Sequence, residues 1–175
     1  LVVVSQHNPV AAKDNWVSIR AKNFFLIGNA NEKEIRQVAL RLEQFREAFT
    51  IIFPKIRFNS AVPTTVVVFK SNSSYAPFKP NPNLAGYFQP GPDVNYITLT
   101  TEFGNNDPYA VKLSGSQDAF TVIFHEYTHL LVNNTFKDAP LWFNEGLAEY
   151  YSTFKMADDQ KFVLGTPIGN HVILL

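Results

Sequence analysis

Cysteine is absent from the 175 residues of this chain. Disulfides, thiolate metal ligands and a cysteine nucleophile are therefore excluded, and any metal site must be built from histidine, aspartate and glutamate. The absence also suits an exported bacterial protein, although cytosolic domains can lack cysteine too. We expect an extracytoplasmic location, either periplasmic or secreted.

The chain also lacks an excess of either charge and any long apolar run. Fifteen Lys and Arg residues balance fifteen Asp and Glu residues, which argues against nucleic acid or an anionic membrane surface as a partner. The apolar start at residues 1–4 is far too short to span a membrane, and it carries no methionine. We therefore interpret the chain as a mature protein or an excised fragment. Its length and its 46% of hydrophobic residues predict one globular domain over residues 1–175.

The hydrophobic pattern predicts strands in the first part of the chain. They are expected at residues 16–28, 64–70, 85–89 and 94–100, and an apolar end at residues 172–175 resembles a further strand. Polar residues with proline and glycine predict loops at residues 71–84 and 101–115.

Helices are predicted once early in the chain and twice near its end. Asn31 and Glu34 resemble a capping box at the start of an amphipathic helix over residues 31–49. A second helix runs from Ser114 or Ser116 to about residue 133, and a third from Asp138 and Pro140 to about residue 156. This order predicts an α+β fold, with helices gathered on a mixed, largely antiparallel sheet.

The strongest signal is an H-E-x-x-H run, His125-Glu126-Tyr127-Thr128-His129, inside an apolar helical stretch. Residues four apart lie on one face of a helix, so both imidazoles can reach one metal ion. Glu126 follows the first ligand, where it can serve as general base and later as proton donor to the leaving amine. Three nitrogen or oxygen ligands with one open position is the arrangement of catalytic zinc, so we predict one Zn²⁺ per chain.

Two acids on the next predicted helix offer the third ligand. Glu145 follows His129 by sixteen positions, and Glu149 lies four residues further on the same helix face. One acid can bind the metal while the other accepts the second N–H of a ligand histidine and fixes its orientation. Aromatic and apolar neighbours argue against two solvated carboxylates.

These two motifs together resemble those of the gluzincin peptidases, most of all the peptidase MA-like domains of bacterial exported proteins. The likeness covers about residues 118–152. Asn144-Glu145-Gly146 is similar to the Asn-Glu-Gly of the membrane alanyl aminopeptidases, whose glutamate is the third zinc ligand. Thermolysin-like enzymes have a comparable Asn-Glu, with an acid four residues later that orients the first histidine.

The resemblance implies a zincin-like fold in which the helix after the active-site helix carries the third ligand. Glu145 is then that ligand, and Glu149 is the acid that orients His125. Spacing alone suits Glu149 as the ligand, because the gap from His129 to Glu145 is shorter than in those two large families. The Gly-x-Met-Glu-Asn run that grips a free substrate amine is missing, so exopeptidase activity is not implied.

Two further parts of a peptidase site are expected from the resemblance. The substrate is bound along an edge strand before the zinc helix. The residues in the expected place are Asn95, Tyr96, Ile97 and Thr98, for which an ordinary hairpin strand is the alternative. An oxyanion stabiliser is also needed, usually a tyrosine or a histidine. The candidates are Tyr150, Tyr151, Tyr87 and His171, or a residue beyond the end of the chain.

The sequence thus predicts a zinc-dependent peptidase that acts on a peptide or protein substrate, with no nucleic-acid partner and no membrane-spanning segment. The alternative is a zincin-like module that binds zinc, has little or no catalytic activity, and serves in binding or scaffolding. A third possibility, a metal-free structural domain, requires both motifs to be accidental.

Overall fold

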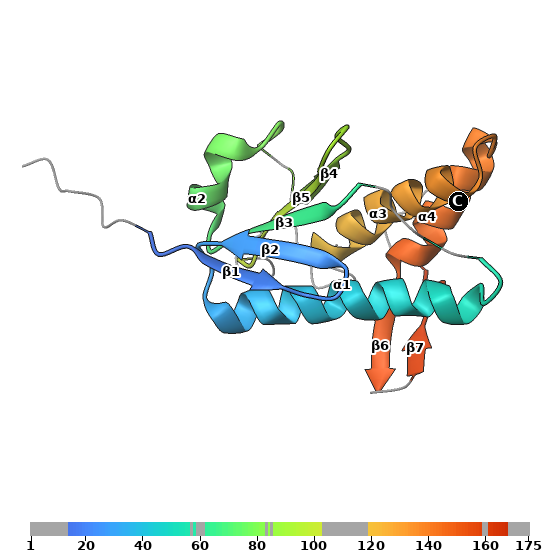
Figure 1. The fold of residues 1–175 in the computed structure, drawn as a ribbon, viewed down its shortest axis with the longest axis horizontal. Helices are drawn as coiled ribbons and strands as arrows, with labels where there is room; N and C mark the ends of the chain where they lie inside the picture. The colour runs from blue at the N-terminus through green and yellow to red at the C-terminus, as the bar shows by residue number, and fades with distance from the viewer. Residues whose placement is uncertain are drawn as a thin grey trace, which may run out of the picture.

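A five-stranded sheet is the frame of the protein (Figure 1). The computed structural model describes residues 14–56, 58, 62–82, 84, 86–102, 119–158 and 161–167. The strands of this sheet are β1 (Val17–Arg20), β2 (Phe24–Gly28), β3 (Thr64–Phe69), β4 (Gly86–Gln89) and β5 (Asn95–Thr100). A separate hairpin pairs β6 (Lys155–Asp158) with β7 (Lys161–Val163).

The sheet is mixed, with the strand order β1-β2-β3-β5-β4. Its three central strands β2, β3 and β5 are parallel, whereas β1 and β4 run antiparallel to their neighbours. Counting the β6–β7 hairpin, three of the five strand pairings are antiparallel. Parallel neighbours need a crossover connection, and helix α1 (Glu32–Ile52) supplies the one between β2 and β3. The predicted α+β class with a mixed sheet is confirmed.

Helix α1 begins at the capping box predicted for Asn31 and Glu34. The side chain of Asn31 accepts a hydrogen bond from the Glu34 amide at 2.9 Å, and the Glu34 carboxylate accepts one from the Asn31 amide at 3.3 Å. The helix buries one apolar face in the core, as its 3.6-residue period predicts. The buried side chains are Ile35, Val38, Ala39, Leu42, Phe45, Ala48 and Phe49.

Aromatic rings join α1 to helices α3 (Ala119–Thr135) and α4 (Leu141–Ser152). Phe45 stacks on Phe124 of α3 with 4.2 Å between ring centroids, and Phe49 packs on Tyr151 of α4 at 4.3 Å. Arg46 of α1 also donates a hydrogen bond of 2.8 Å to the hydroxyl of Tyr127 on α3. Together these contacts fix the rotation of α3 about its axis, and so decide which of its residues turn away from the core.

The other face of the sheet carries a smaller aromatic cluster around α2 (Asn72–Tyr75) and the 3-10 helix η1 (Ala76–Phe78), which lie across the sheet from α1 (Figure 1). Phe69 at the end of β3 stacks on Tyr75 and on Phe78. The Tyr75 hydroxyl hydrogen-bonds with the Thr98 hydroxyl at 2.7 Å. Burial raises the pKa of Tyr75 to about 12.

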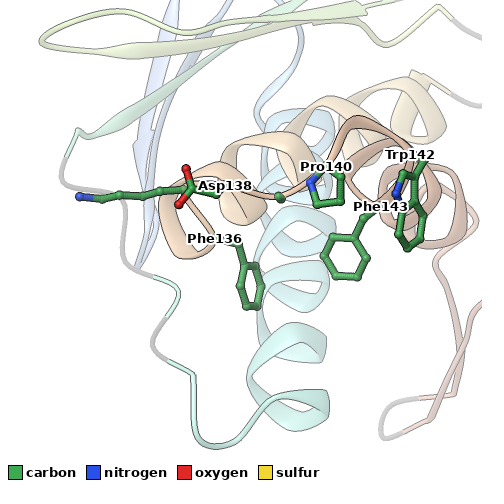
Figure 2. Close-up of a pocket in the computed structure, with 7 residues that line it drawn as sticks. Phe136, Asp138, Pro140, Trp142 and Phe143 are labelled. Atoms are coloured by element: carbon green, nitrogen blue, oxygen red, sulfur yellow. The ribbon is translucent and has the colours of Figure 1, made fainter.

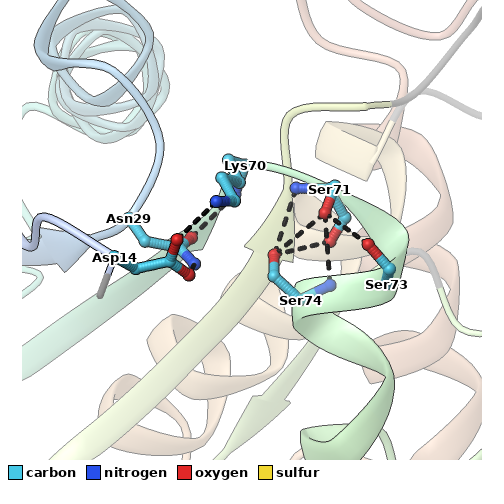
Figure 3. A network of polar contacts seen from close by, with 6 residues as sticks. All are labelled: Asp14, Asn29, Lys70, Ser71, Ser73 and Ser74. Atoms are coloured by element: carbon cyan, nitrogen blue, oxygen red, sulfur yellow. Dashed lines mark hydrogen bonds and ion pairs between the residues drawn. The ribbon is translucent and has the colours of Figure 1, made fainter. Parts of the chain in front are cut away.

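Short polar side chains begin α2 (Figure 3). The Ser71 hydroxyl accepts from the Ser74 amide and the Ser74 hydroxyl accepts from the Ser71 amide, which is a capping box. Beside it, Lys70 pairs with Asp14, and Asn29 donates to the same carboxylate; both interactions lower the pKa of Asp14. The loop predicted for residues 71–84 is therefore wrong at its start, where serines that are typical of loops act as helix caps.

Helix α4 ends at Ser152, earlier than the end predicted near residue 156. Phe154 is buried against Phe45 and Phe124, which draws the chain off the helix axis, and Met156 then lies in β6. None of the described helices is both long and apolar enough to cross a membrane. The strand predicted at residues 172–175 and the cap predicted at Ser114 or Ser116 lie outside the described residues.

Candidate metal centre

His125 and His129 lie one turn apart on α3 and converge. Their Nε2 atoms are 3.1 Å apart, and each side chain is 20% exposed. The intervening Tyr127 and Thr128 are buried, so the two histidines share the side of α3 that is turned away from the core. The one-face arrangement predicted for an i, i+4 pair is confirmed.

Glu145 of α4 closes a triangle with the two histidines. Its Oε2 atom is 3.5 Å from the Nε2 atom of His125 and 3.6 Å from that of His129, and half of its side chain is exposed. For comparison, a tetrahedral ion with bonds of about 2.0–2.1 Å has ligand atoms about 3.3–3.4 Å apart. Separations of 3.1, 3.5 and 3.6 Å bracket that length, so these three groups can hold one metal ion.

Glu149 lies beside the other nitrogen of the same ring. Its Oε1 atom is 3.6 Å from Nδ1 of His125, and its side chain is 45% exposed. A ligand imidazole uses one nitrogen for the metal and gives the other N–H to an acceptor. The position of Glu149 is that of the acceptor, whereas the carboxylate of Glu145 faces the two Nε2 atoms.

His129 has a different partner, which sequence reasoning missed. Its Nδ1 atom is 2.9 Å from Oδ1 of Asn144, and Nδ2 of Asn144 donates to Oδ1 of Asn133 at 2.9 Å. The Asn-Glu-Gly motif by itself gives Asn144 no role at the metal centre. The position of Asn144 on the helix could have predicted this contact. Asn144 precedes Glu145 and lies about 100° away around α4, so its side chain can point toward His129 while Glu145 points toward both histidines.

The turn between α3 and α4 sets the two helices at this distance. It consists of residues 136–140. The turn has to be short because only sixteen positions separate His129 from Glu145. Pro140 is the N-cap of α4, and its carbonyl accepts from the amides of Phe143 and Asn144. Proline suits the start of a helix because it lacks the N–H that would find no partner there. The first turn of α4 therefore brings Asn144 and Glu145 against α3.

Glu126 is half-buried beside the first histidine. Among the residues that the structure describes, no lysine or arginine forms an ion pair with it. The plainest alternative to a catalytic base is a surface glutamate paired with a lysine. The described residues do not show such a pair for Glu126. An unpaired carboxylate in partly buried surroundings is available to accept a proton.

Two of the predicted oxyanion stabilisers lie away from the histidines. Tyr151 is buried in the core, where burial raises its pKa, and the hydroxyl of Tyr87 donates to the Phe78 carbonyl beyond the other face of the sheet. The ring of Tyr150 packs over Gly165, whose φ of 72° is open to glycine without strain. Tyr150 stays a prediction, and His171 lies outside the described residues.

The strand predicted to bind substrate is not an edge strand. β5, which contains Asn95, Tyr96, Ile97 and Thr98, is hydrogen-bonded to β3 on one side and to β4 on the other. Its backbone edges are therefore occupied, and this prediction is wrong. In the hairpin of β4 and β5, β4 lies at the end of the sheet. Among the described strands, the free edge near α3 is therefore that of β4, which packs against this helix.

An open hollow of about 510 Å³ lies at the turn between α3 and α4 (Figure 2). Its lining includes Phe136, Asp138, Pro140 and Phe143 and none of the four residues His125, His129, Glu145 and Glu149. Leu141 and Trp142, which begin α4 one turn before Glu145, are 74% and 76% exposed. An apolar surface therefore adjoins the metal centre without being part of it.

No protein-family model matches the chain, and no curated protein matches it.

Proposed function

We propose that the protein is a zinc-dependent peptidase with one zinc ion per chain, held by His125, His129 and Glu145. The observation that carries the proposal is the meeting of three ligand atoms, each within 3.6 Å of the other two, beside a glutamate without an ion-pair partner among the described residues. The two motifs resemble those of the gluzincin peptidases. Because the resemblance is strongest to domains of exported bacterial proteins, we also propose an extracytoplasmic location.

Each side chain has a separate task in this proposal. Zinc bound there would act as a Lewis acid that polarises the scissile carbonyl and makes a water molecule more acidic. Glu126 accepts the proton of the attacking water and then gives it to the leaving amine. Asn144 holds the ring of His129 by a hydrogen bond at Nδ1, and the carboxylate of Glu149, 3.6 Å from Nδ1 of His125, attracts the N–H of that ring. Both contacts keep the Nε2 atoms turned toward the metal.

The free edge of β4 is the proposed place for the substrate backbone. An extended peptide can add to an unpaired strand edge through main-chain hydrogen bonds. β4 lies at the end of the sheet and packs against α3, so a peptide added there runs alongside the helix that carries the histidines. The recognition is by backbone groups, which makes peptides the substrate class that this edge fits.

Metal content and turnover test the proposal together. We expect one zinc per chain in protein purified without chelator, and cleavage of unfolded casein that Glu126→Gln abolishes while the zinc stays. The amide is close in shape to the carboxylate but does not accept the proton. Glu47→Gln, at an exposed position of α1, is the matched control and should leave both readings unchanged.

The second candidate function is a zinc-binding module with little or no turnover. It is favoured by the positions of Tyr151 and Tyr87, which bring no hydroxyl to the histidines. Zinc at one per chain with cleavage that Glu126→Gln leaves unchanged would assign the cleavage to a contaminant and favour the module. Absence of zinc from the wild-type protein, even after incubation with zinc salts, would remove both candidates.

A further inference from the structure

The side chains of Asn144 and Asn133 form a chain of two hydrogen bonds that ends at His129. Oδ1 of Asn144 lies 2.9 Å from Nδ1 of His129, and Nδ2 of Asn144 donates to Oδ1 of Asn133 at 2.9 Å. Asn133 follows His129 by four residues on α3, so both lie on the helix face turned to α4. The two hydrogen bonds therefore link His129 and Asn133 of α3 through Asn144 of α4.

The orientation of the Asn144 amide decides which nitrogen of His129 carries the hydrogen. An amide presents an acceptor on one side and donors on the other. When its oxygen faces Nδ1, the ring must donate from Nδ1, and Nε2 keeps its lone pair for a metal. When its NH₂ group faces Nδ1, the hydrogen of a neutral ring must sit on Nε2, where it blocks metal binding.

We propose that Asn133 is a positioning residue that holds the Asn144 amide in the productive orientation and thereby fixes the tautomer of His129. The inference rests on the proposed metal centre and adds to it a residue that, among the described residues, hydrogen-bonds to Asn144 and not to a ligand. Oδ1 of Asn133 accepts only from the NH₂ group of Asn144. Rotation of that amide by half a turn would set two oxygens against each other unless the Asn133 amide turned with it, and an aspartate at 133, which has no donor side, removes that alternative.

The other histidine explains why this support is needed on one side only. Nδ1 of His125 faces the carboxylate of Glu149 at 3.6 Å. An ionised carboxylate has no donor on either side, so every orientation of it selects the same tautomer of the ring. An amide has two unequal sides and selects a tautomer only when a further residue holds it.

Asn133 and its neighbour Asn134 provide a matched pair for the test. Both are exposed near the end of α3, and no side-chain hydrogen bond among the described residues involves Asn134. The experiment measures the zinc dissociation constant by chelator competition in the full chain. We expect Asn133→Ala to weaken zinc binding by about tenfold or more, within the 10–100-fold loss typical of residues that support metal ligands. Asn134→Ala should leave it unchanged.

Substitution by aspartate separates the acceptor role from a mere loss of packing. An aspartate at 133 keeps the acceptor and cannot present a donor, so Asn133→Asp should retain wild-type affinity or exceed it. Asn134→Asp adds the same negative charge one position away and corrects for simple attraction of the cation. Equal weakening by Asn133→Asp and Asn133→Ala would overturn the proposal, as would an unchanged affinity in Asn133→Ala.

A second readout needs neither zinc nor turnover. Nitrogen-15 NMR of the metal-free protein, at a pH where His129 is neutral, reports the tautomer of its ring. We expect hydrogen on Nδ1 in the wild type and in Asn133→Asp, and a mixture in Asn133→Ala. A wild type that binds no zinc but shows this pattern would refute the proposed function and leave the role of Asn133 standing. A tautomer that is unaffected by Asn133→Ala would refute the role of Asn133 alone.

Discussion

Helix α3 has an inner face that holds the fold and an outer face that holds the metal centre. On the inner face Ile123, Phe124 and Tyr127 are at most 3% exposed and pack against α1 and the sheet. On the outer face, His125 and His129 are each 20% exposed and contact polar groups of α4. The burial that stabilises the protein and the groups that can bind a metal thus lie on opposite sides of one helix.

This division has an energetic consequence. Apolar burial contributes most of the free energy of folding, and it is concentrated on the inner face. The side chains of the outer face bury little apolar surface on folding, and they remain in contact with solvent. Substitutions there should alter metal binding while leaving the stability of the metal-free protein almost unchanged, whereas substitutions of neighbouring residues on the inner face should lower it.

The largest expected effect compares two adjacent residues, Phe124 and His125. Phe124→Ala removes a ring that stacks on Phe45 at 4.2 Å, and we expect it to lower the free energy of unfolding by about 3–5 kcal/mol. His125→Ala should lower it by about 0.5 kcal/mol or less in metal-free protein. Urea unfolding in the presence of chelator measures both. Similar losses for the two variants would show that the outer face also carries the fold.

The inner face was the part most open to prediction from sequence, because it obeys periodicity. The buried positions of α1 recur with the helical period, and Asn31 and Glu34 announce the start of the helix. Period alone did not predict where α4 ends, because Phe154 is drawn into the core by rings that are distant in sequence. The small helices at residues 72–78 were missed since the serine caps have the composition of a loop.

The outer face was predicted only as far as local spacing reaches. Four-residue spacing puts His125 with His129 and Glu145 with Glu149, but which acid faces which nitrogen depends on how the two helices pack. Strand order is equally non-local, so the place of β4 outside β5 was not visible in the hairpin pattern. Asn133 and Asn144 meet across the helices at a separation that no motif describes.

Zinc itself gives the next largest effect. Because an ion that binds only the folded state stabilises it by mass action, free zinc at 100 times its dissociation constant should raise the free energy of unfolding by about 2.7 kcal/mol. His129→Ala should abolish this gain without changing the metal-free value by more than about 0.5 kcal/mol. Urea unfolding with and without zinc tests both statements. An equal gain in His129→Ala would mean that zinc binds elsewhere.

The two acids of α4 should differ in a smaller but measurable way. Glu145→Ala removes a carboxylate that faces both Nε2 atoms and should nearly empty the site. Glu149→Ala removes only the acceptor beside Nδ1 of His125 and should weaken zinc binding by about 10–100-fold. Zinc dissociation constants decide between them. If Glu149→Ala loses zinc and Glu145→Ala retains it, the ligand assignment is reversed and the longer spacing was the better guide.

The smallest expected effect belongs to a residue of the metal motif that faces inward. Tyr127→Phe keeps the ring packed against Phe24 and Phe45 but removes the hydroxyl that accepts from Arg46. We expect a loss of about 1 kcal/mol in unfolding free energy, the usual net value of such a hydrogen bond, with unchanged zinc affinity. A change in zinc affinity would show that the inner and outer faces are coupled.

The same variant carries a pH dependence whose sign follows from burial. Burial raises the pKa of the Tyr127 phenol above its usual value of 10.0, although Arg46 acts in the opposite direction. The unfolded chain therefore releases this proton first, so the contribution of the neutral phenol is fully present below about pH 10 and declines as the pH rises further. Tyr127→Phe has no such proton, and the buried Tyr75 and Tyr151 titrate equally in both proteins. In urea unfolding, the difference in unfolding free energy between the wild type and Tyr127→Phe should therefore shrink above pH 10. A difference that stays constant to pH 11 would show that the phenol ionises as easily in the folded protein as in the unfolded chain.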